Sequence, residues 1–283
     1  MQRRGHPEGA LPLLQSAIAA AERDSHQIAQ IGTLNNLGVM HLALHQYPNA
    51  IASLEQALQL AHRISDADKE TMCLHNLATV HLSNGDAELA AQLHSTVLAA
   101  CQAAGNAMGE ASARHKLGDD LRQMGRYDEA ATPYTTALKI RERMGSLRGQ
   151  GTLHAALAAL HLGTGNPERA LGHGERALDL HGQARDDPGL CDALVLTADI
   201  RRTLRAPHEA IQDAERAASL SVDLGDSRRH CRALTALADA LAAAGDPARA
   251  HATCAQAMAL LDEVDDPHLH PVHDRLHAIQ RSP

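Results

Sequence analysis

The stretch Gly125-Arg126-Tyr127-Asp128-Glu129-Ala130, GRYDEA in one-letter code, decides the fold because the rest of the chain repeats it. Copies of it stand at residues 85–90 (GDAELA), 165–170 (GNPERA), 245–250 (GDPARA), and in weaker form at 46–50 (QYPNA) and 206–210 (APHEA). All copies are separated by forty residues or a multiple of forty. Each copy ends in alanine, and this first column consists of Ala50, Ala90, Ala130, Ala170, Ala210 and Ala250. A fixed period of this length indicates a repeat protein.

Two further columns of small residues keep the same period. The second consists of Ala57, Val97, Ala137, Ala177, Ala217 and Ala257, and the third of Gly38, Ala78, Gly118, Ala158, Ala198 and Ala238. Apolar residues between the columns recur at helical spacing, and Gly, Pro, Asp or Asn separates one helix from the next. Each unit is therefore predicted to be a pair of helices that buries its apolar face by stacking on the next pair. The fold class that follows is all-α, a one-dimensional α-solenoid.

The composition agrees with such an array and argues against several partners. The chain of 283 residues has no Trp, no Phe and three Tyr, so its buried volume must come from small and aliphatic side chains. A formal net charge of −8, from 34 acidic and 26 basic residues, predicts no direct nucleic-acid binding and no membrane surface. The five cysteines form no C-x-x-C pair, which is typical of buried thiols in a reducing compartment, and no apolar run is long enough to span a bilayer. We expect a cytoplasmic protein.

The columns resemble the signature of the tetratricopeptide repeat family. The resemblance covers nearly the whole chain and is carried by the pairs Leu37-Gly38, Leu77-Ala78, Leu117-Gly118 and Leu157-Ala158, followed by the alanine columns. The chain departs from the family at its large aromatic positions, because leucine replaces the common Trp and His41, His81 and His161 replace the common Tyr. The forty-residue unit is similar to those of kinesin light chains and of the C-terminal arrays of actinobacterial transcriptional regulators. The resemblance implies a right-handed superhelix.

The period also predicts how the chain divides. We expect one array over residues 1–283, with a half unit at 5–28, full units at 31–70, 71–110, 111–150, 151–190, 191–230 and 231–270, and a C-terminal capping helix at 271–283. The half unit corresponds to a second helix whose first helix is missing, so either Met1 is not the native start or a partner covers the exposed end. End-to-end pairing of two copies through this half unit is therefore one expected homo-oligomer.

The stretch Leu34-Asn35-Asn36-Leu37-Gly38 places two side-chain amides in an otherwise apolar helix. By the resemblance, the first helices of the pairs line a concave groove that takes an extended peptide or a partner helix. The groove residues that it implies are Asn35, Asn36, Val39, His75, Asn76, Thr79, His115, Lys116, Asp119 and Arg122. Amides on a groove wall can both donate to and accept from a peptide backbone. The alternative, that Asn35 and Asn36 face solvent or bond a neighbouring helix, has equal weight.

Two other groups of residues could form specific binding sites, but we expect neither of them to do so. The third unit is locally basic, with Arg114, Arg126 and their neighbours able to dock an acidic peptide, but a solvated face with ion pairs is favoured. The run His268–His277 places His273 and His277 one helical turn apart, yet structural zinc needs four ligands and no cysteine lies nearby in the sequence. We expect neither a bound metal nor a cofactor.

No catalytic pattern is present in the sequence, because nucleophile and base pairs, phosphate-binding loops and zinc-protease motifs are all missing. We therefore expect no enzyme. The first functional hypothesis is a protein–protein interaction module that binds a peptide or a partner protein in its concave groove. The alternative is the sensor or regulatory C-terminal part of a bacterial transcriptional or signalling regulator, whose output domains lie upstream. The residues do not name the partner or the oligomeric state.

Overall fold

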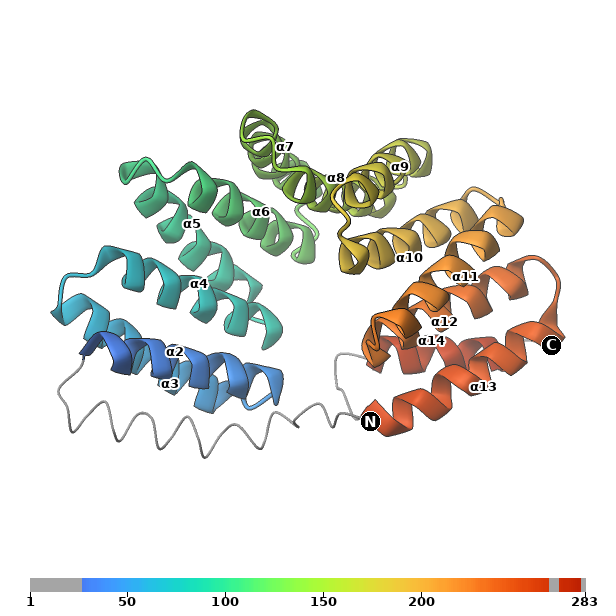
Figure 1. Cartoon of the computed structure of the whole chain (residues 1–283), viewed down its shortest axis with the longest axis horizontal. Helices are drawn as coiled ribbons and strands as arrows, with labels where there is room; N and C mark the ends of the chain where they lie inside the picture. The colour runs from blue at the N-terminus through green and yellow to red at the C-terminus, as the bar shows by residue number, and fades with distance from the viewer. Residues whose placement is uncertain (1–26, 265–269, 281–283) are drawn as a thin grey trace. The chain divides into compact units, whose positions relative to one another are not determined.

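A helix begins every twenty residues along most of the chain. The computed structural model describes residues 27–264 and 270–280, and within these ranges it contains thirteen α-helices and no strand, which confirms the all-α fold class. The helices are α2 (Gln27–Ala43), α3 (Tyr47–Arg63), α4 (Ala67–Ser83), α5 (Ala87–Ala103), α6 (Ala107–Gln123), α7 (Tyr127–Arg143), α8 (Leu147–Gly163), α9 (Pro167–Gln183), α10 (Asp187–Thr203), α11 (Pro207–Asp223), α12 (Ser227–Ala243), α13 (Pro247–Val264) and α14 (His270–Gln280) (Figure 1).

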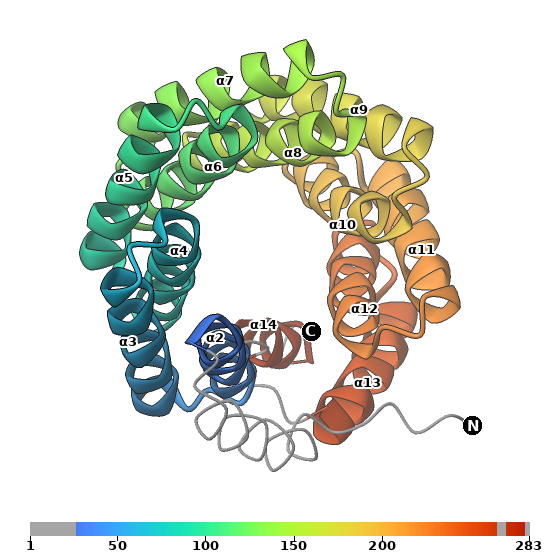
Figure 2. The ribbon, with the colours of Figure 1, turned by 60° about the vertical axis from the view of Figure 1, so that its left-hand side comes forward.

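The chain forms two compact units. Unit 1 ends at Ala137 and unit 2 begins at Leu138, so the division falls inside α7. In unit 1 the first helices of the pairs, α2, α4 and α6, follow one another in one row, and the second helices α3 and α5 form another row (Figure 2). In unit 2 the first helices α8, α10, α12 and α14 contact one another in sequence, and each also packs against a second helix.

The turns between helices share one backbone conformation. The middle residue of each turn, from residue 45 to residue 245 at intervals of twenty, has a positive φ. In the turn after α4, the amide of Gly85 donates to the carbonyl of Leu82 and the amide of Asp86 donates to that of His81. Seven of these eleven positions are glycine, which adopts this conformation without steric cost. The other four are His45, Ser65, Arg185 and Arg205.

Side-chain caps fix where several first helices begin. Asp66 accepts from the amide of Lys69 at 3.0 Å, and Asn106 accepts from the amide of Gly109 at 2.9 Å. Ser146 and Asp226 cap α8 and α12 in the same way. Each such cap contributes about 1 kcal/mol because it satisfies an amide that has no partner inside the helix.

The three columns of small residues lie in the core, as predicted from the period. Every alanine of the first column is at most 1% exposed, and the second column is at most 4% exposed. At Gly38 an added Cβ would stand 2.5 Å from Cγ of Leu54, and at Gly118 it would stand 2.5 Å from Cε1 of Tyr134. Both distances are far shorter than a van der Waals contact, so the helices are close enough that only glycine fits at these two positions. Close approach thus replaces aromatic bulk as the means of filling the core.

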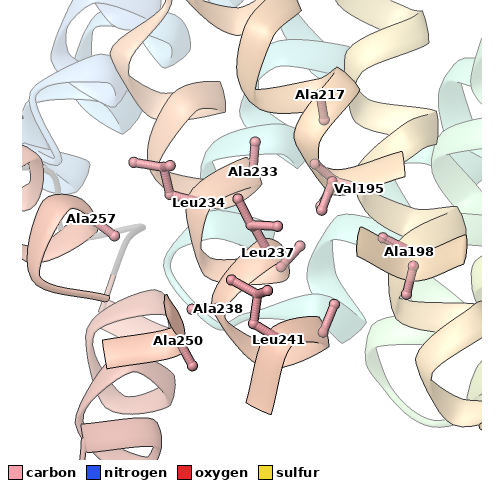
Figure 3. Close-up of a cluster of buried hydrophobic side chains, with 14 of the residues drawn as sticks. Val195, Ala198, Ala217, Ala233, Leu234, Leu237, Ala238, Leu241, Ala250 and Ala257 are labelled. Carbon is pink, nitrogen blue, oxygen red and sulfur yellow. The ribbon is translucent and has the colours of Figure 1, made fainter. Parts of the chain in front are cut away.

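Unit 2 shows the same packing over five consecutive helices. Its core cluster runs from Cys191 in α10 to Ile279 in α14 and is made almost entirely of alanine and leucine (Figure 3). Leu237 and Leu241 of α12 lie between column residues of the neighbouring helices, including Ala198 and Ala250 (Figure 3). The five cysteines are free and buried, as the spacing predicted.

The predicted division of the chain is only partly within the described residues. Most of the half unit at 5–28, and with it the predicted end-to-end pairing, lies outside them. The helices that open the pairs begin at Gln27, Ala67 and Ala107, four residues before the unit boundaries at 31, 71 and 111. The last helix, α14, packs on α12 and α13 through Leu276 and Ile279. Its role as an end cap stays a prediction, and residues 281–283 are outside the described range.

The shared turn conformation predicts opposite effects for two substitutions. A Cβ at Gly125 would meet no atom, so Gly125→Ala tests the backbone alone and should lower the free energy of unfolding by about 1–2 kcal/mol. Arg205→Gly should raise it by roughly 0.5 kcal/mol, because relief of the strained φ exceeds the added entropy of the unfolded chain. Urea denaturation followed by circular dichroism measures both. A neutral Gly125→Ala would contradict the left-handed turn.

Candidate functional site

A hollow of about 450 Å³ opens along the first helices of unit 1. Its lining comes from α4 and α6, with α5 at its floor, and includes the predicted groove residues His75 and Asn76. Cys101 and Val97 of α5 contribute apolar surface, and Thr71 of α4 and Ser112 of α6 contribute hydroxyls. The lining is mixed, because six of its eleven residues have polar side chains: Asp68, Thr71, His75, Asn76, Asn106 and Ser112. Polar groups that converge beside apolar surface are common in binding sites.

The two asparagines of the Leu34–Gly38 stretch have different surroundings. Asn35 is 7% exposed, and its Oδ1 accepts a hydrogen bond from Nδ2 of Asn76 at 2.7 Å. This bond joins α2 to α4, so for Asn35 the alternative of bonding a neighbouring helix holds. Asn36 is exposed and, within the described part of the chain, has no side-chain hydrogen bond. The side-chain amide of Asn36 is therefore available to a partner, whereas the amide of Asn76 already donates one hydrogen bond to Asn35.

A fully buried polar pair lies next to the hollow. Nδ1 of His94 in α5 lies 2.6 Å from Oδ2 of Asp120 in α6, and both side chains are 0% exposed. The ring of His94 lies 5.1 Å from that of His75, which lines the hollow. Burial, with smaller contributions from His94 and Lys116, lowers the pKa of His75 to about 4. His75 is thus a neutral donor and acceptor at pH 7.

His94 is not among the predicted site residues, although its position in the repeat is a signal. His94 stands forty residues after Leu54 and forty before Tyr134, and both of those side chains fill the core. A histidine in that register must find a polar partner. Asp120 is that partner. It follows the predicted groove residue Asp119 in the sequence, but the two carboxylates bond to different helices, Asp120 to His94 of α5 and Asp119 to Tyr134 of α7.

The predicted residues of α6 form one cluster around Asp119. The hydroxyl of Tyr134 donates to Oδ1 of Asp119 at 2.8 Å, and Nζ of Lys116 lies 3.5 Å from Oδ2. Nε2 of His115 lies 3.7 Å from the same oxygen. Tyr134 is completely buried against Gly118, and burial, together with the charge of Asp119, raises its pKa. These three groups hold the Asp119 carboxylate in place.

The remaining predicted groove residues are less engaged with one another. Val39 is 43% exposed on α2, and Thr79 donates its hydroxyl to the carbonyl of His75 in its own helix. Nε of Arg122 is buried and, among the described residues, has no hydrogen-bond partner, although the Arg122 side chain does interact with Tyr134. Whether these side chains contact a partner stays a prediction.

The favoured interpretation of the basic third unit agrees with the ion pairs present. Arg114 pairs with Glu110 at 2.8 Å, and Arg126 pairs with Glu129 at 2.6 Å. Both arginines are thus paired with acidic side chains of their own helices or turns. The described residues contain no group of three or more side chains placed to hold a metal ion, and none of their helices is long and apolar enough to cross a membrane.

Stacked, alternating helices with small residues at fixed columns define a helical-repeat protein, and a family model matches part of this chain. The model described as "Tetratricopeptide repeat" matches residues 28–103 and again residues 70–143. Residues 28–143 therefore carry tetratricopeptide repeats, and the resemblance read from the columns is confirmed. No curated protein matches the chain.

Solved structures share the fold at low identity. The repeats of a kinesin light chain described as putative, from Podosopora anserina, are 17% identical with a TM-score of 0.57, over 68% of this chain and 94% of that one. A signal transduction ATPase with numerous domains (STAND) and a tetratricopeptide repeat sensor, from Pyrococcus horikoshii, is 14% identical with a TM-score of 0.67, over 98% of this chain and 44% of that one. This chain therefore spans less than half of the STAND protein.

A third structure is a conjugation gene regulator solved with a peptide. The Rap conjugation gene regulator of plasmid pLS20, in complex with the Phr* peptide, is 16% identical with a TM-score of 0.66. The similarity covers 92% of this chain and 77% of that one. At this level of identity the three structures establish the fold of the chain.

The His94–Asp120 pair predicts strong non-additivity. Asp120→Ala leaves a buried imidazole without its partner and should lower the free energy of unfolding by about 3 kcal/mol. The double variant His94→Leu with Asp120→Ala removes both polar groups and should lose less than the single variant. Denaturant titrations of the two single variants and the double variant measure this. Simple additivity would show that the pair does not interact in the folded chain.

Proposed function

We propose that the chain is a protein–protein interaction module whose unit 1 binds an extended peptide segment along α2, α4 and α6. The observation that carries the proposal is the hollow between α4 and α6, lined by His75 and Asn76. Its volume of about 450 Å³ lies within the range typical of ligand pockets, roughly 300–1,000 Å³. The role is binding rather than catalysis.

The polar groups along this row suit a peptide backbone. Asn36 offers a donor and an acceptor that the described residues do not use, and His75 is neutral, so one ring nitrogen donates and the other accepts. Backbone amides and carbonyls require this mixture of donors and acceptors. The apolar side chains of the floor, Val97 and Cys101, would cover one apolar side chain of the segment.

The charges of the row set a limit on which peptides bind well. Asp119 is held by Tyr134, Lys116 and His115, so its carboxylate is partly neutralised and turned toward the protein. The Asp119 carboxylate is thus already paired with groups of the chain itself. We infer that hydrogen bonding and apolar contact, rather than charge attraction, dominate the affinity, which should depend weakly on salt.

The relatives are consistent with this proposal. The Rap regulator of plasmid pLS20 has the same fold and was solved with the Phr* peptide. Peptide binding is a property of that protein, and we carry it to this chain as part of the proposal. The residues that would perform it here are those of unit 1 named above.

The test compares two matched sets of substitutions. A randomised peptide library is selected on the immobilised chain, and the affinity of one selected peptide is measured by fluorescence anisotropy. Asn36→Ala alone, and Asn36→Ala with Asn76→Ala and Lys116→Ala, should weaken binding, the triple variant by about tenfold or more. The control replaces Gln56, Gln92 and Thr96, which are exposed on the second helices α3 and α5, with alanine and should bind as the parent does.

Circular dichroism must show unchanged helicity in both sets, because Asn76→Ala also removes the bond to Asn35. Equal loss in the two sets would mean that the peptide does not lie on the first helices. Failure of any peptide to be enriched would argue against peptide binding by the isolated chain.

A second candidate is that the array is the sensor part of a larger regulator. The observation that favours it is the STAND protein, whose similarity covers 98% of this chain but only 44% of its own length. Under this proposal the peptide bound by unit 1 controls domains on the same polypeptide. The intact mass of the native protein from its source cells decides the matter. A mass well above 30.1 kDa is expected for a regulator, and a mass near that value would exclude it.

A further inference from the structure

Three histidines and two arginines of unit 2 stand together on α8 and α9, which pack against each other (Figure 1). His154 and His161 lie two turns apart on α8. Arg169, His173 and Arg176 are spaced by four and three residues on α9, so they share one face of that helix. Nδ1 of His154 is 2.9 Å from Nδ1 of His173, and the rings of His161 and His173 are stacked. We call these five residues the histidine–arginine row.

The contact between the two Nδ1 atoms fixes where the protons are. One Nδ1 must donate the hydrogen bond and the other must accept it. The accepting ring is neutral with its single proton on Nε2, so that Nε2 is a donor. Among the described residues, Nε2 of His154 and Nε2 of His173 have no hydrogen-bond partner. The pair therefore offers an unused N–H donor while its own hydrogen bond stays intact.

No negative charge in the described part of unit 2 balances the row. No carboxylate there is within ion-pair distance of Arg169, Arg176 or the three histidines. Two acids of α9, Glu168 and Glu175, each precede one of the arginines by one residue and so fall on a different side of the helix. Glu175 pairs instead with Arg201 of α10 at 3.3 Å. Surroundings of this kind disfavour a cation and favour an anion.

The pKa values of the three histidines agree with positive surroundings. Burial, followed by the charges of His173 and Arg176, lowers the pKa of His154 to about 4. Burial also lowers the pKa of His161, with the charge of Arg169 as the second cause, and that of His173, with His161 as the second cause. An anion beside the row would act in the opposite direction and raise these pKa values. Protons and an anion should therefore strengthen each other's binding.

The next repeat has a carboxylate of its own at the corresponding position. Forty residues after His173 stands Asp213, whose Oδ2 accepts from Nη1 of Arg201 at 2.6 Å. Burial raises the pKa of Asp213, and the charges of Arg201 and Arg216 oppose that rise. Arg216 is the counterpart of Arg176, forty residues on. The histidine–arginine row thus keeps the arginine of this arrangement but not the carboxylate.

We propose that the histidine–arginine row binds a phosphate or carboxylate group of a ligand, in the role that the Asp213 carboxylate has in the next repeat. The donors to its oxygens are Nε2–H of the His154–His173 pair and the guanidinium of Arg176. Arg169 adds positive charge at the other end of the row. All these residues belong to unit 2, so the site is separate from the peptide site proposed for unit 1.

The experiment titrates the whole chain with sodium phosphate and, separately, with sodium acetate, while NaCl keeps the ionic strength constant. Nitrogen-resolved NMR of the histidine rings reports which nitrogen carries each proton. We expect a saturable shift at the ring nitrogens of His154 and His173. A response to phosphate alone identifies a phosphate ligand, a response to acetate alone a carboxylate ligand, and a response to both a site for either group. The affinity for acetate should rise by about threefold or more between about pH 7 and about pH 5.5, because protonation adds a second Nε2–H donor.

The variants separate anion binding from packing. His154→Phe and Arg176→Gln should each weaken binding by about tenfold or more. The double variant His161→Arg with His173→Asp builds the ion pair of the next repeat into the row, so it should abolish binding while the chain stays folded. The control Arg63→Gln, at an exposed arginine of α3, should bind as the parent does.

The proposal would be overturned by no saturable response to either anion in the parent, or by an unchanged affinity in both His154→Phe and Arg176→Gln. Binding retained by the double variant, or an affinity for acetate that does not change with pH, would also contradict it. His154→Gln is a second form in case the phenylalanine disturbs the packing of α8 on α9. A thermal unfolding curve for each variant verifies that it is folded.

Discussion

The close approach of helix backbones is the constraint on which the rest of this structure depends. Without Trp or Phe, the chain cannot fill wide spaces between helices, and it instead brings the helices together over alanine and glycine. Gly38 and Gly118 are two tight points in the columns, where the side chains of Leu54 and Tyr134 occupy the place of a Cβ. A larger residue in a column would separate two helices, and each later pair would inherit the displacement. The columns therefore tolerate less change than the exposed faces between them.

Regular packing also explains why polar groups meet across helices. Residues about forty positions apart lie at the same height on neighbouring first helices, so Asn35 and Asn76 meet although 41 positions separate them in the sequence. Second helices add polar groups from below, as His94 and Tyr134 do for Asp120 and Asp119. The face of unit 1 is thus a set of short polar contacts whose members come from different repeats. Its chemistry belongs to the stack rather than to any single pair.

The sequence predicted the fold far better than the site, for a physical reason. Small residues at fixed intervals have one explanation, close helix contact, so the columns led to the helix pairs directly. Asn35 and Asn36 are adjacent, yet a rotation of about 100° per residue buries one and exposes the other. Periodicity known only to within a residue cannot separate them. The pair His94–Asp120 was missed because it joins two helices, and pairing across helices depends on rotations that a single sequence does not reveal.

The identical turn after nearly every helix has a consequence for how such a chain changes over generations. Each helix packs on the next, and first helices pack on first helices, so a segment of forty residues carries one helix of each kind with all the surfaces that it needs. Removing or duplicating such a segment joins surfaces that are already complementary. A segment of twenty residues would place a first helix where a second helix belongs. Recombination can therefore alter the length of the array in whole pairs, while polar contacts between particular helices would be lost or copied with them.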